Sequence, residues 1–346
     1  MNRRAFTSGS MGGVLRLAVA WLAAGSTLPG SAWGQEPEAP PELVGEAALF
    51  QELPSVTAAS KYEQDPREAP ASISVITQEE IERFGYRTLG EALNGARGFF
   101  TSYDRNYTYV AVRGFTLPGD YNTRILLLVD GHRLNDNVAD AAYVGTEAAI
   151  DLSTVERIEI IRGAASSLYG TNAFYAVVNV ITRSGRELQG GEVRADAGTF
   201  GSYRARALYG QRAPGGVEFL VGGGFYRSSG PDLYFPEFDS PATNNGFAVG
   251  LDGDRTADAF AKLTYEGWSF QAGAQGRRKE VPTASYETTF QDPRLATRDG
   301  RAFAVARYDH PFADLSRVNV SLAFDRQRYT GTYPYDGVVQ RDLQSG

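Results

Sequence analysis

After Gly185 the sequence alternates between apolar and polar residues, and a period of two is the pattern of β-strands that separate two environments. In GEVRADAGTF, residues 191–200, the apolar Val193, Ala195 and Ala197 alternate with charged residues. We count seven such segments of about ten residues, which is the length of a tilted transmembrane strand. Residues 186–346 are therefore predicted to form about seven antiparallel strands of an outer-membrane β-barrel.

The connections between these segments support a barrel over a soluble sandwich, which also alternates and has frequent turns. The turns at 212–216, 266–267 and 310–316 are short, whereas the connections at 228–256 and 280–300 are long and polar. Short turns on one rim and long loops on the other are typical of outer-membrane barrels. To enclose the preceding domain such a barrel needs on the order of 20 strands. We therefore expect the chain to be the N-terminal part of a longer protein.

The region before Gly185 has different signals and predicts a compact α+β domain over residues 53–185. Thr77 with Glu80, and Thr88 with Glu91, have the spacing of helix N-caps, and glycines follow each short helix. Two of the predicted strands are continuous apolar runs, which indicates a sheet covered on both faces. The strands are expected at Tyr109–Phe115, Arg124–Gly131, Glu156–Gly163 and Ala176–Thr182.

The first residues read as an export signal and a linker. Residues 1–34 contain Arg3 and Arg4, a short apolar core and small residues before Gln35, which predicts a cleaved signal peptide. Residues 35–52 are rich in Pro and Glu and predict a mobile periplasmic linker.

Composition excludes several other functions. The chain has no Cys, which excludes thiolate metal sites, and its only histidines are His132 and His310, which nearly excludes a multi-His metal site or a His-based catalytic triad. The net charge of −7 with scattered Lys and Arg argues against nucleic-acid binding. No metal, cofactor or enzymatic activity is expected.

The ordered motifs of residues 53–185 resemble TonB-dependent outer-membrane receptors. The similarity lies in the order and spacing of APASISVITQEEIERFG, TLGEALNGARGFF, VRGF, ILLLVDGHRLND, VERIEIIRG, SSLYGTNA and VVNVIT. The resemblance implies a plug domain that fills a barrel of about 22 strands. The residues that carry the plug motif are Gly114, Asp130, Gly131, Gly163, Gly170 and Asn179.

The resemblance also implies a function, namely energised uptake of a scarce ligand such as a ferric siderophore or cobalamin across the outer membrane. TonB, driven by the ExbB–ExbD complex, would pair with a box released from the plug, and Val56, Thr57 and Ala58 are the candidate box. A plain linker is the alternative for these three residues. For the whole chain the alternatives are a passive or structural plugged barrel and a non-functional receptor fragment.

Two sets of site residues follow from the same resemblance. Plug arginines at Arg-Gly positions would pair with acidic residues of the inner barrel wall, which implies this role for Arg113 and Arg162; an ion pair within the plug is the alternative. The plug loops at 101–109 and 133–145 are expected to face the ligand. Their candidate residues are Tyr103, Arg105, Tyr107, Asn135, Asp136 and Tyr143, and turn formation is the alternative role of the Asn and Asp residues.

Overall fold

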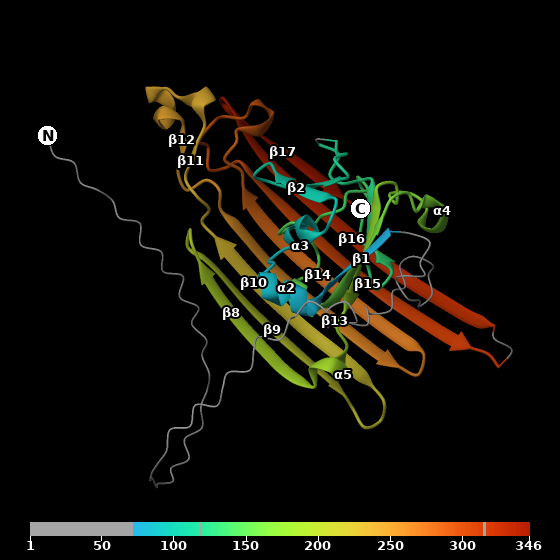
Figure 1. Cartoon of the computed structure of the whole chain (residues 1–346). Helices are drawn as coiled ribbons and strands as arrows, with labels where there is room; N and C mark the ends of the chain where they lie inside the picture. Colours follow the sequence, from blue (N-terminus) through green and yellow to red (C-terminus); the bar gives the residue numbers. More distant parts are fainter. Residues whose placement is uncertain (1–71, 118, 314–315) are drawn as a thin grey trace, which may run out of the picture. The chain divides into compact units, whose positions relative to one another are not determined.

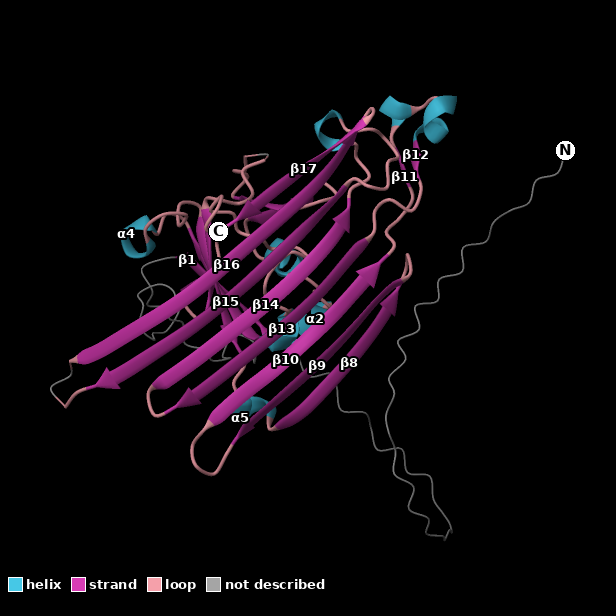
Figure 2. Ribbon diagram, turned by 180° about the vertical axis from the view of Figure 1, so that it is seen from behind, coloured by secondary structure: helices cyan, strands magenta, loops and turns pink. Residues whose placement is uncertain are grey.

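The structure, a computed structural model, describes residues 72–117, 119–313 and 316–346, which belong to one compact unit. Two sheets dominate it, and the smaller, N-terminal sheet lies against one face of the larger one in both views (Figures 1 and 2). The expected α+β domain followed by antiparallel strands is confirmed. The proposed signal peptide, linker and TonB box fall outside the described residues.

The N-terminal sheet has five strands in the order β1-β6-β7-β4-β5. All five residues of β4 (ILLLV) are buried, as are six of the seven in β7 (AVVNVIT), so both continuous apolar runs occupy the covered centre of the sheet. β4 and β7 are parallel, and the other neighbours are antiparallel. The bounds are β1 Ser72–Thr77, β4 Ile125–Val129, β5 His132–Arg133, β6 Val155–Arg162 and β7 Ala176–Thr182.

The helices of this domain begin where the capping residues predict. The Thr77 hydroxyl accepts the Glu80 N–H at the start of α2, and Gly85 ends that helix with a left-handed backbone (φ 67°). The Thr88 hydroxyl accepts the Glu91 N–H in the same way at the start of α3. The helices are α2 Gln78–Phe84, α3 Leu89–Gly95, α4 Ser166–Tyr169 and α5 Gly185–Leu188, with a 3-10 turn η1 at Leu152–Thr154.

The strand expected at Tyr109–Phe115 lies outside the five-stranded sheet. It forms β3 (Thr108–Val112), which pairs with β2 (Phe99–Tyr103) as a separate hairpin. Arg113 (φ 54°) and Gly114 (φ 83°) follow β3 with left-handed backbones, which bend the chain and end the strand. The predicted ligand loop at 101–109 is therefore largely a β-hairpin.

The second sheet has eight antiparallel strands in the order β17-β16-β15-β14-β13-β10-β9-β8, one more than expected (Figure 2). The additional strand, β17, has polar residues on both faces and so lacks the apolar alternation used to find the others. The strands are β8 Gly190–Gly198, β9 Ser202–Arg212, β10 Glu218–Ser228, β13 Asp254–Tyr265, β14 Trp268–Glu280, β15 Ala296–Pro311, β16 Arg317–Tyr335 and β17 Val338–Ser345.

The expected asymmetry of connections is present. The long connections hold a small hairpin and several 3-10 turns, which lie at one end of the eight-stranded sheet, whereas the turns at the opposite end are short (Figure 1). These elements are β11 Leu233–Tyr234, β12 Phe247–Ala248, η2 Pro236–Phe238, η3 Pro241–Gly246 and η4 Ser285–Glu287.

Alternation gives the eight-stranded sheet an inner and an outer face. On the inner face Leu220, Phe260 and Phe303 are buried in the same apolar cluster as the five-stranded sheet. On the outer face Leu322 and Phe324 are 76% and 63% exposed. An inner face packed on a domain and an outer face of exposed apolar side chains is the arrangement of a membrane-embedded barrel wall.

Candidate functional site

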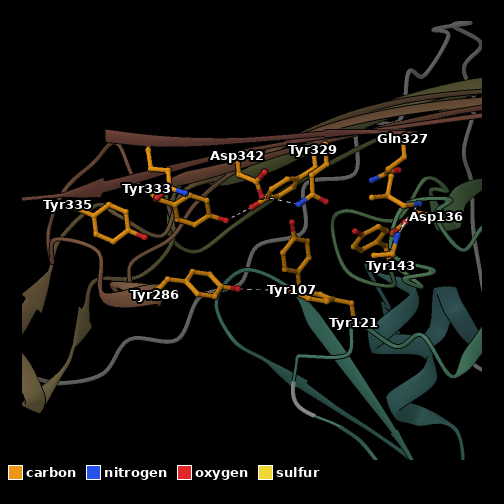
Figure 3. A pocket seen from close by; sticks show the side chains of 14 residues that line it. Tyr107, Tyr121, Asp136, Tyr143, Tyr286, Gln327, Tyr329, Tyr333, Tyr335 and Asp342 are labelled. Carbon is orange, nitrogen blue, oxygen red and sulfur yellow. Dashed lines mark hydrogen bonds between the residues drawn. The ribbon is translucent and has the colours of Figure 1, made fainter. Parts of the chain in front are cut away.

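We call the eight-stranded sheet the wall, and the end of it that carries the long connections its long-loop end. A tyrosine-lined cavity of about 410 Å³ lies between the N-terminal domain and the long-loop end of the wall (Figure 3). We call it the tyrosine pocket. Both parts of the structure contribute side chains, and most of these are phenols, carboxylates or amides. The lining residues are Tyr107, Tyr121, Asp136, Val138, Ala139, Tyr143, Tyr286, Gln327, Tyr329, Tyr333, Tyr335, Gln340, Asp342 and Gln344.

The N-terminal domain positions Tyr107 by contacts on several sides. The Tyr107 ring lies edge-on to Tyr121 at a centroid distance of 5.3 Å and 5.7 Å from the Tyr143 ring. Its hydroxyl donates to Asp299 Oδ1 on β15 at 2.8 Å. Buried Asn122 fixes the surrounding loops, because its amide bonds the backbones of Thr108, Val110 and Ala142. Tyr107 is therefore held in place before any ligand arrives.

The wall contributes its side of the pocket through strand alternation. Tyr329, Tyr333 and Tyr335 stand at odd positions of β16, so they share the inner face. The Tyr329 and Tyr333 hydroxyls are hydrogen-bonded to each other. Tyr286, from the long connection after β14, places its hydroxyl 3.3 Å from that of Tyr121 and links this loop to the N-terminal domain.

The charges of the pocket are negative. Asp136 and Asp342 are its only ionisable groups besides the phenols, and no Arg, Lys or His of the described residues lines it. Asp136 Oδ1 accepts the N–H groups of Val138 and Ala139, so its carboxylate also holds a turn. Burial raises the pKa of Tyr107 and Tyr143, and nearby carboxylates raise it further. These phenols therefore remain neutral donors of hydrogen bonds.

The structure brings together half of the residues that we predicted to face the ligand. Tyr107, Asp136 and Tyr143 line the pocket. Tyr103 is 46% exposed and does not line it, and Arg105 forms an ion pair with Asp252 at 3.3 Å.

Asn135 is buried, and its side chain forms hydrogen bonds with backbone groups. Its side chain accepts the N–H of Leu127 and donates to the carbonyls of Ile125 and Asp140. This is the turn-forming role that we had kept as the alternative, while a role of Asn135 in ligand binding stays a prediction.

Sequence reasoning missed five tyrosines of the pocket. The alternating run RYTGTYPYDG contains Tyr329, Tyr333 and Tyr335 on one face, and this spacing could have indicated them. Tyr121 and Tyr286 sit in irregular loops and left no pattern in the sequence.

A second constellation, the Arg277 cluster, anchors the N-terminal domain to the wall. The Arg277 side chain on β14 is fully buried, and its Nε donates to Asp254 Oδ1 at 3.2 Å. Glu147 of the N-terminal domain and Asp299 lie 3.7 Å and 3.6 Å from Nη1. Nη2 donates to the carbonyl of Asn106 at 2.7 Å. Burial raises the pKa of Glu147, and the Arg277 guanidinium opposes that rise.

Three other ion pairs across this boundary have the same polarity, with the cation on the wall and the carboxylate on the N-terminal domain, whereas Arg105–Asp252 and Arg183–Glu192 have the reverse polarity. Lys262 Nζ lies 2.9 Å from Asp130 Oδ2, in the Asp130–Gly131 turn between β4 and β5. Arg206 lies 3.4 Å from Asp151, and Arg194 pairs with Glu82. These pairs are a main electrostatic contact between the two parts.

The two arginines that we predicted to lock the plug to the barrel wall, Arg113 and Arg162, are not part of these ion pairs. Arg162 Nη1 donates to the carbonyl of Arg97, within the N-terminal domain, at 2.9 Å. Arg113 is exposed in the turn after β3. Neither arginine forms an ion pair with a wall carboxylate among the described residues, so the lock stays a prediction.

The other residues of the sequence motif shape the backbone. Gly131, Gly163 and Gly170 have left-handed or related backbones, with φ of 77°, 117° and 76°. The buried Asn179 accepts the Gly131 N–H through Oδ1 and so ties the turn after β4 to β7.

Within the described ranges, no group of three or more His, Cys, Asp or Glu residues could hold a metal ion. In the same ranges, no helix is both long and apolar enough to cross a membrane.

Comparisons with known proteins agree with this architecture. Residues 65–177 match the family described as TonB-dependent Receptor Plug Domain. The vitamin B12 transporter BtuB of Vibrio vulnificus is 30% identical over 185 residues, which cover 53% of this chain and 29% of that protein. The iron-regulated outer membrane virulence protein of Vibrio cholerae is 35% identical over 143 residues, 40% of this chain and 21% of that protein. The chain thus spans under a third of either relative.

Solved structures of receptors share the fold. The ferripyoverdine receptor of Pseudomonas aeruginosa superimposes with a TM-score of 0.59 at 16% identity, over 81% of this chain and 37% of that one. The ferric yersiniabactin receptor FyuA of Yersinia pestis gives 0.58 at 19% identity, over 80% and 44%. Residues 65–177 thus belong to the TonB-dependent receptor plug family, and the chain as described has the fold of a plug packed against the antiparallel strands of a receptor barrel.

Proposed function

We propose that the receptor takes up a scarce iron chelate or corrinoid across the outer membrane, energised by TonB and ExbB–ExbD, with the plug as its gate. The observation that carries this proposal is the tyrosine pocket, because plug and wall build it jointly. A ligand bound there touches both parts and can change their contact. In this proposal residues 1–34 direct export, residues 35–52 are a linker, residues 53–185 are the plug and residues 186–346 belong to the wall. The role is binding and transport rather than catalysis.

Tyr107 supports a link between ligand binding and gating. Its ring lines the pocket, its hydroxyl bonds Asp299, and the Arg277 guanidinium lies 5.7 Å from its ring centroid. The pocket and the Arg277 cluster thus share one side chain. A ligand that moves Tyr107 would disturb the anchor of the plug.

Energised uptake is tested by introducing the Val56→Pro substitution into the chromosomal copy of the gene. Proline removes a backbone N–H and blocks strand addition, so uptake of radiolabelled ferric chelates and cobalamin should fall to the level of a deletion strain. Binding to whole cells should stay unchanged. The matched control is Val56→Ile, which keeps the β-branched side chain and should transport normally. If Val56→Pro transports like the wild type, the barrel is passive.

The charge of the tyrosine pocket predicts which ligands enter. Asp136 and Asp342 should favour neutral or cationic ligands over polyanionic ones, because like charges repel strongly where water is scarce. We expect a neutral or singly cationic ferric tris-hydroxamate to bind better than a trianionic ferric tris-catecholate. Asp342→Asn should reduce the ratio between the affinities for these two chelates by about tenfold.

The control for this comparison is Asp336→Asn, in the exposed turn between β16 and β17, which removes a carboxylate outside the pocket. It should leave the ranking unchanged. Competition binding to receptor-bearing outer membranes measures both variants. Stronger binding of the trianionic chelate by the wild type would contradict the charge argument and leave the transport proposal standing.

A further inference from the structure

Four arginines stand directly opposite one another on adjacent strands of the wall. Arg227 on β10 pairs in register with Arg255 on β13, Arg255 with Arg278 on β14, and Arg278 with Arg298 on β15. Figure 2 shows these four strands side by side. Further arginines on β16 and β17 continue the set. We call all seven the outer arginines: Arg227, Arg255, Arg278, Arg298, Arg326, Arg328 and Arg341.

Alternation places these side chains on the outer face. Each follows or precedes a residue whose side chain is turned to the plug or the pocket, and successive side chains of a strand point to opposite faces. Asp254 and Arg277 belong to the buried Arg277 cluster, next to Arg255 and Arg278. Buried Gln327, which lines the tyrosine pocket, lies between Arg326 and Arg328.

Along the strands, the outer arginines lie at the long-loop side of an apolar band. Beyond them toward the short turns, the outer face carries mainly small or apolar residues and forms a groove of about 560 Å³. The groove is lined by residues such as Val221, Ala261, Leu263, Phe270, Leu322 and Phe324. Near the short turns the ring centroids of Trp268 and Tyr308 are 4.7 Å apart, as in the aromatic girdle of a membrane interface. The arginines therefore stand at the opposite interface, where lipid headgroups begin.

The row is not neutralised within the described part of the chain. Directly opposite residues of antiparallel strands have Cα atoms about 5 Å apart, and like charges at such positions are destabilising. Glu280 is the only described carboxylate within ion-pair distance of an outer arginine, 3.5 Å from Arg278. The excess positive charge calls for an anion from outside the chain.

We propose that the outer arginines bind the phosphate groups of lipid headgroups in the membrane leaflet next to the long loops. Guanidinium groups bind phosphate oxygens in pairs, and several in a row can hold a lipid with more than one phosphate. An arginine deep in hydrocarbon would be costly, whereas the headgroup region provides both water and anions. The inference rests on the proposed place of the chain in the outer membrane and is independent of the ligand in the tyrosine pocket.

The test is the binding of fluorescent lipid A, the bisphosphorylated glycolipid of the outer leaflet, to the purified full-length receptor in a neutral detergent. The variant is Arg227→Gln, Arg255→Gln, Arg278→Gln and Arg298→Gln combined, which removes four charges and keeps side-chain length. We expect lipid A to bind at least tenfold more weakly to this variant, at about the scale set by several lost phosphate contacts. Binding by the wild type should persist in a chelator of divalent cations, since arginine needs no bridging metal.

Two controls make the result specific. Arg317→Gln removes an exposed arginine at the short-turn end of β16 and should bind lipid A as the wild type does. The four corresponding Lys substitutions keep the charge and should retain most of the binding. If the Gln variant does not fold, judged by heat-dependent gel mobility, the pair Arg255→Gln and Arg298→Gln replaces it. Equal binding of dephosphorylated lipid A by the wild type, or unchanged binding by the Gln variant, would overturn the proposal.

Discussion

Replacing Arg277 by Met is expected to loosen the plug from the wall and make the receptor leaky. The substitution leaves Glu147, Asp254 and Asp299 buried around a missing cation. Removing one partner from a buried ion-pair group costs roughly 3–5 kcal/mol, because the remaining charges stay desolvated. It also removes the hydrogen bond to the Asn106 carbonyl that ties the plug loop to β14. The plug should therefore dissociate from the inner face of the wall more often.

The measurement is the protease sensitivity of the plug in outer-membrane vesicles, together with the sensitivity of cells to an antibiotic too large for porins. Both should rise clearly in the Arg277→Met variant. Arg317→Met is the control, because its pair with Asp309 is largely exposed and contributes at most about 1 kcal/mol. Adding Glu147→Gln and Asp254→Asn to Arg277→Met should restore part of the resistance. A plug that stays as protected as in the wild type would show that the Arg277 cluster does not anchor it.

Replacing Tyr107 by Ala is expected to weaken ligand binding by about ten- to a hundredfold, which corresponds to one aromatic contact and one or two hydrogen bonds. Tyr107 lines the pocket and also packs on Tyr121 and Tyr143, so its loss removes a ligand contact and frees its neighbours. Tyr107→Phe keeps the ring and loses the bond to Asp299, so its effect should be smaller.

The Tyr103→Ala variant distinguishes ligand binding in the tyrosine pocket from ligand binding at the tip of the β2–β3 hairpin. Tyr103 ends β2 and lies outside the pocket lining, so its substitution should leave affinity close to the wild-type value. Saturation binding of the transported chelate to outer membranes measures all three variants. If Tyr103→Ala weakens binding more than Tyr107→Ala, the ligand sits on the hairpin and the tyrosine pocket is not its site.

Local patterns in the sequence predicted most of the fold. The apolar runs of β4 and β7, the caps at Thr77 and Thr88 and the alternation after Gly185 each depend on residues close together in the chain. β17 was missed because polar residues stand on both of its faces, Gln340 and Asp342 toward the pocket and Arg341 on the outer face, so the apolar alternation is absent. The β2–β3 hairpin was missed as a unit because its pairing leaves the main sheet.

The sites depend on contacts that no local pattern records. The tyrosine pocket joins Tyr107 to Tyr286 and Tyr329, and the Arg277 cluster joins Glu147 to three strands of the wall. The sequence by itself determined most of the strands, the capped helices and the resemblance to a plug domain, because hydrophobic period and backbone caps act over a few residues. Only the tertiary structure decided which charges meet across the boundary between plug and wall. Strand register and packing bring those groups together over separations of more than a hundred residues, and burial then makes their pairing strong.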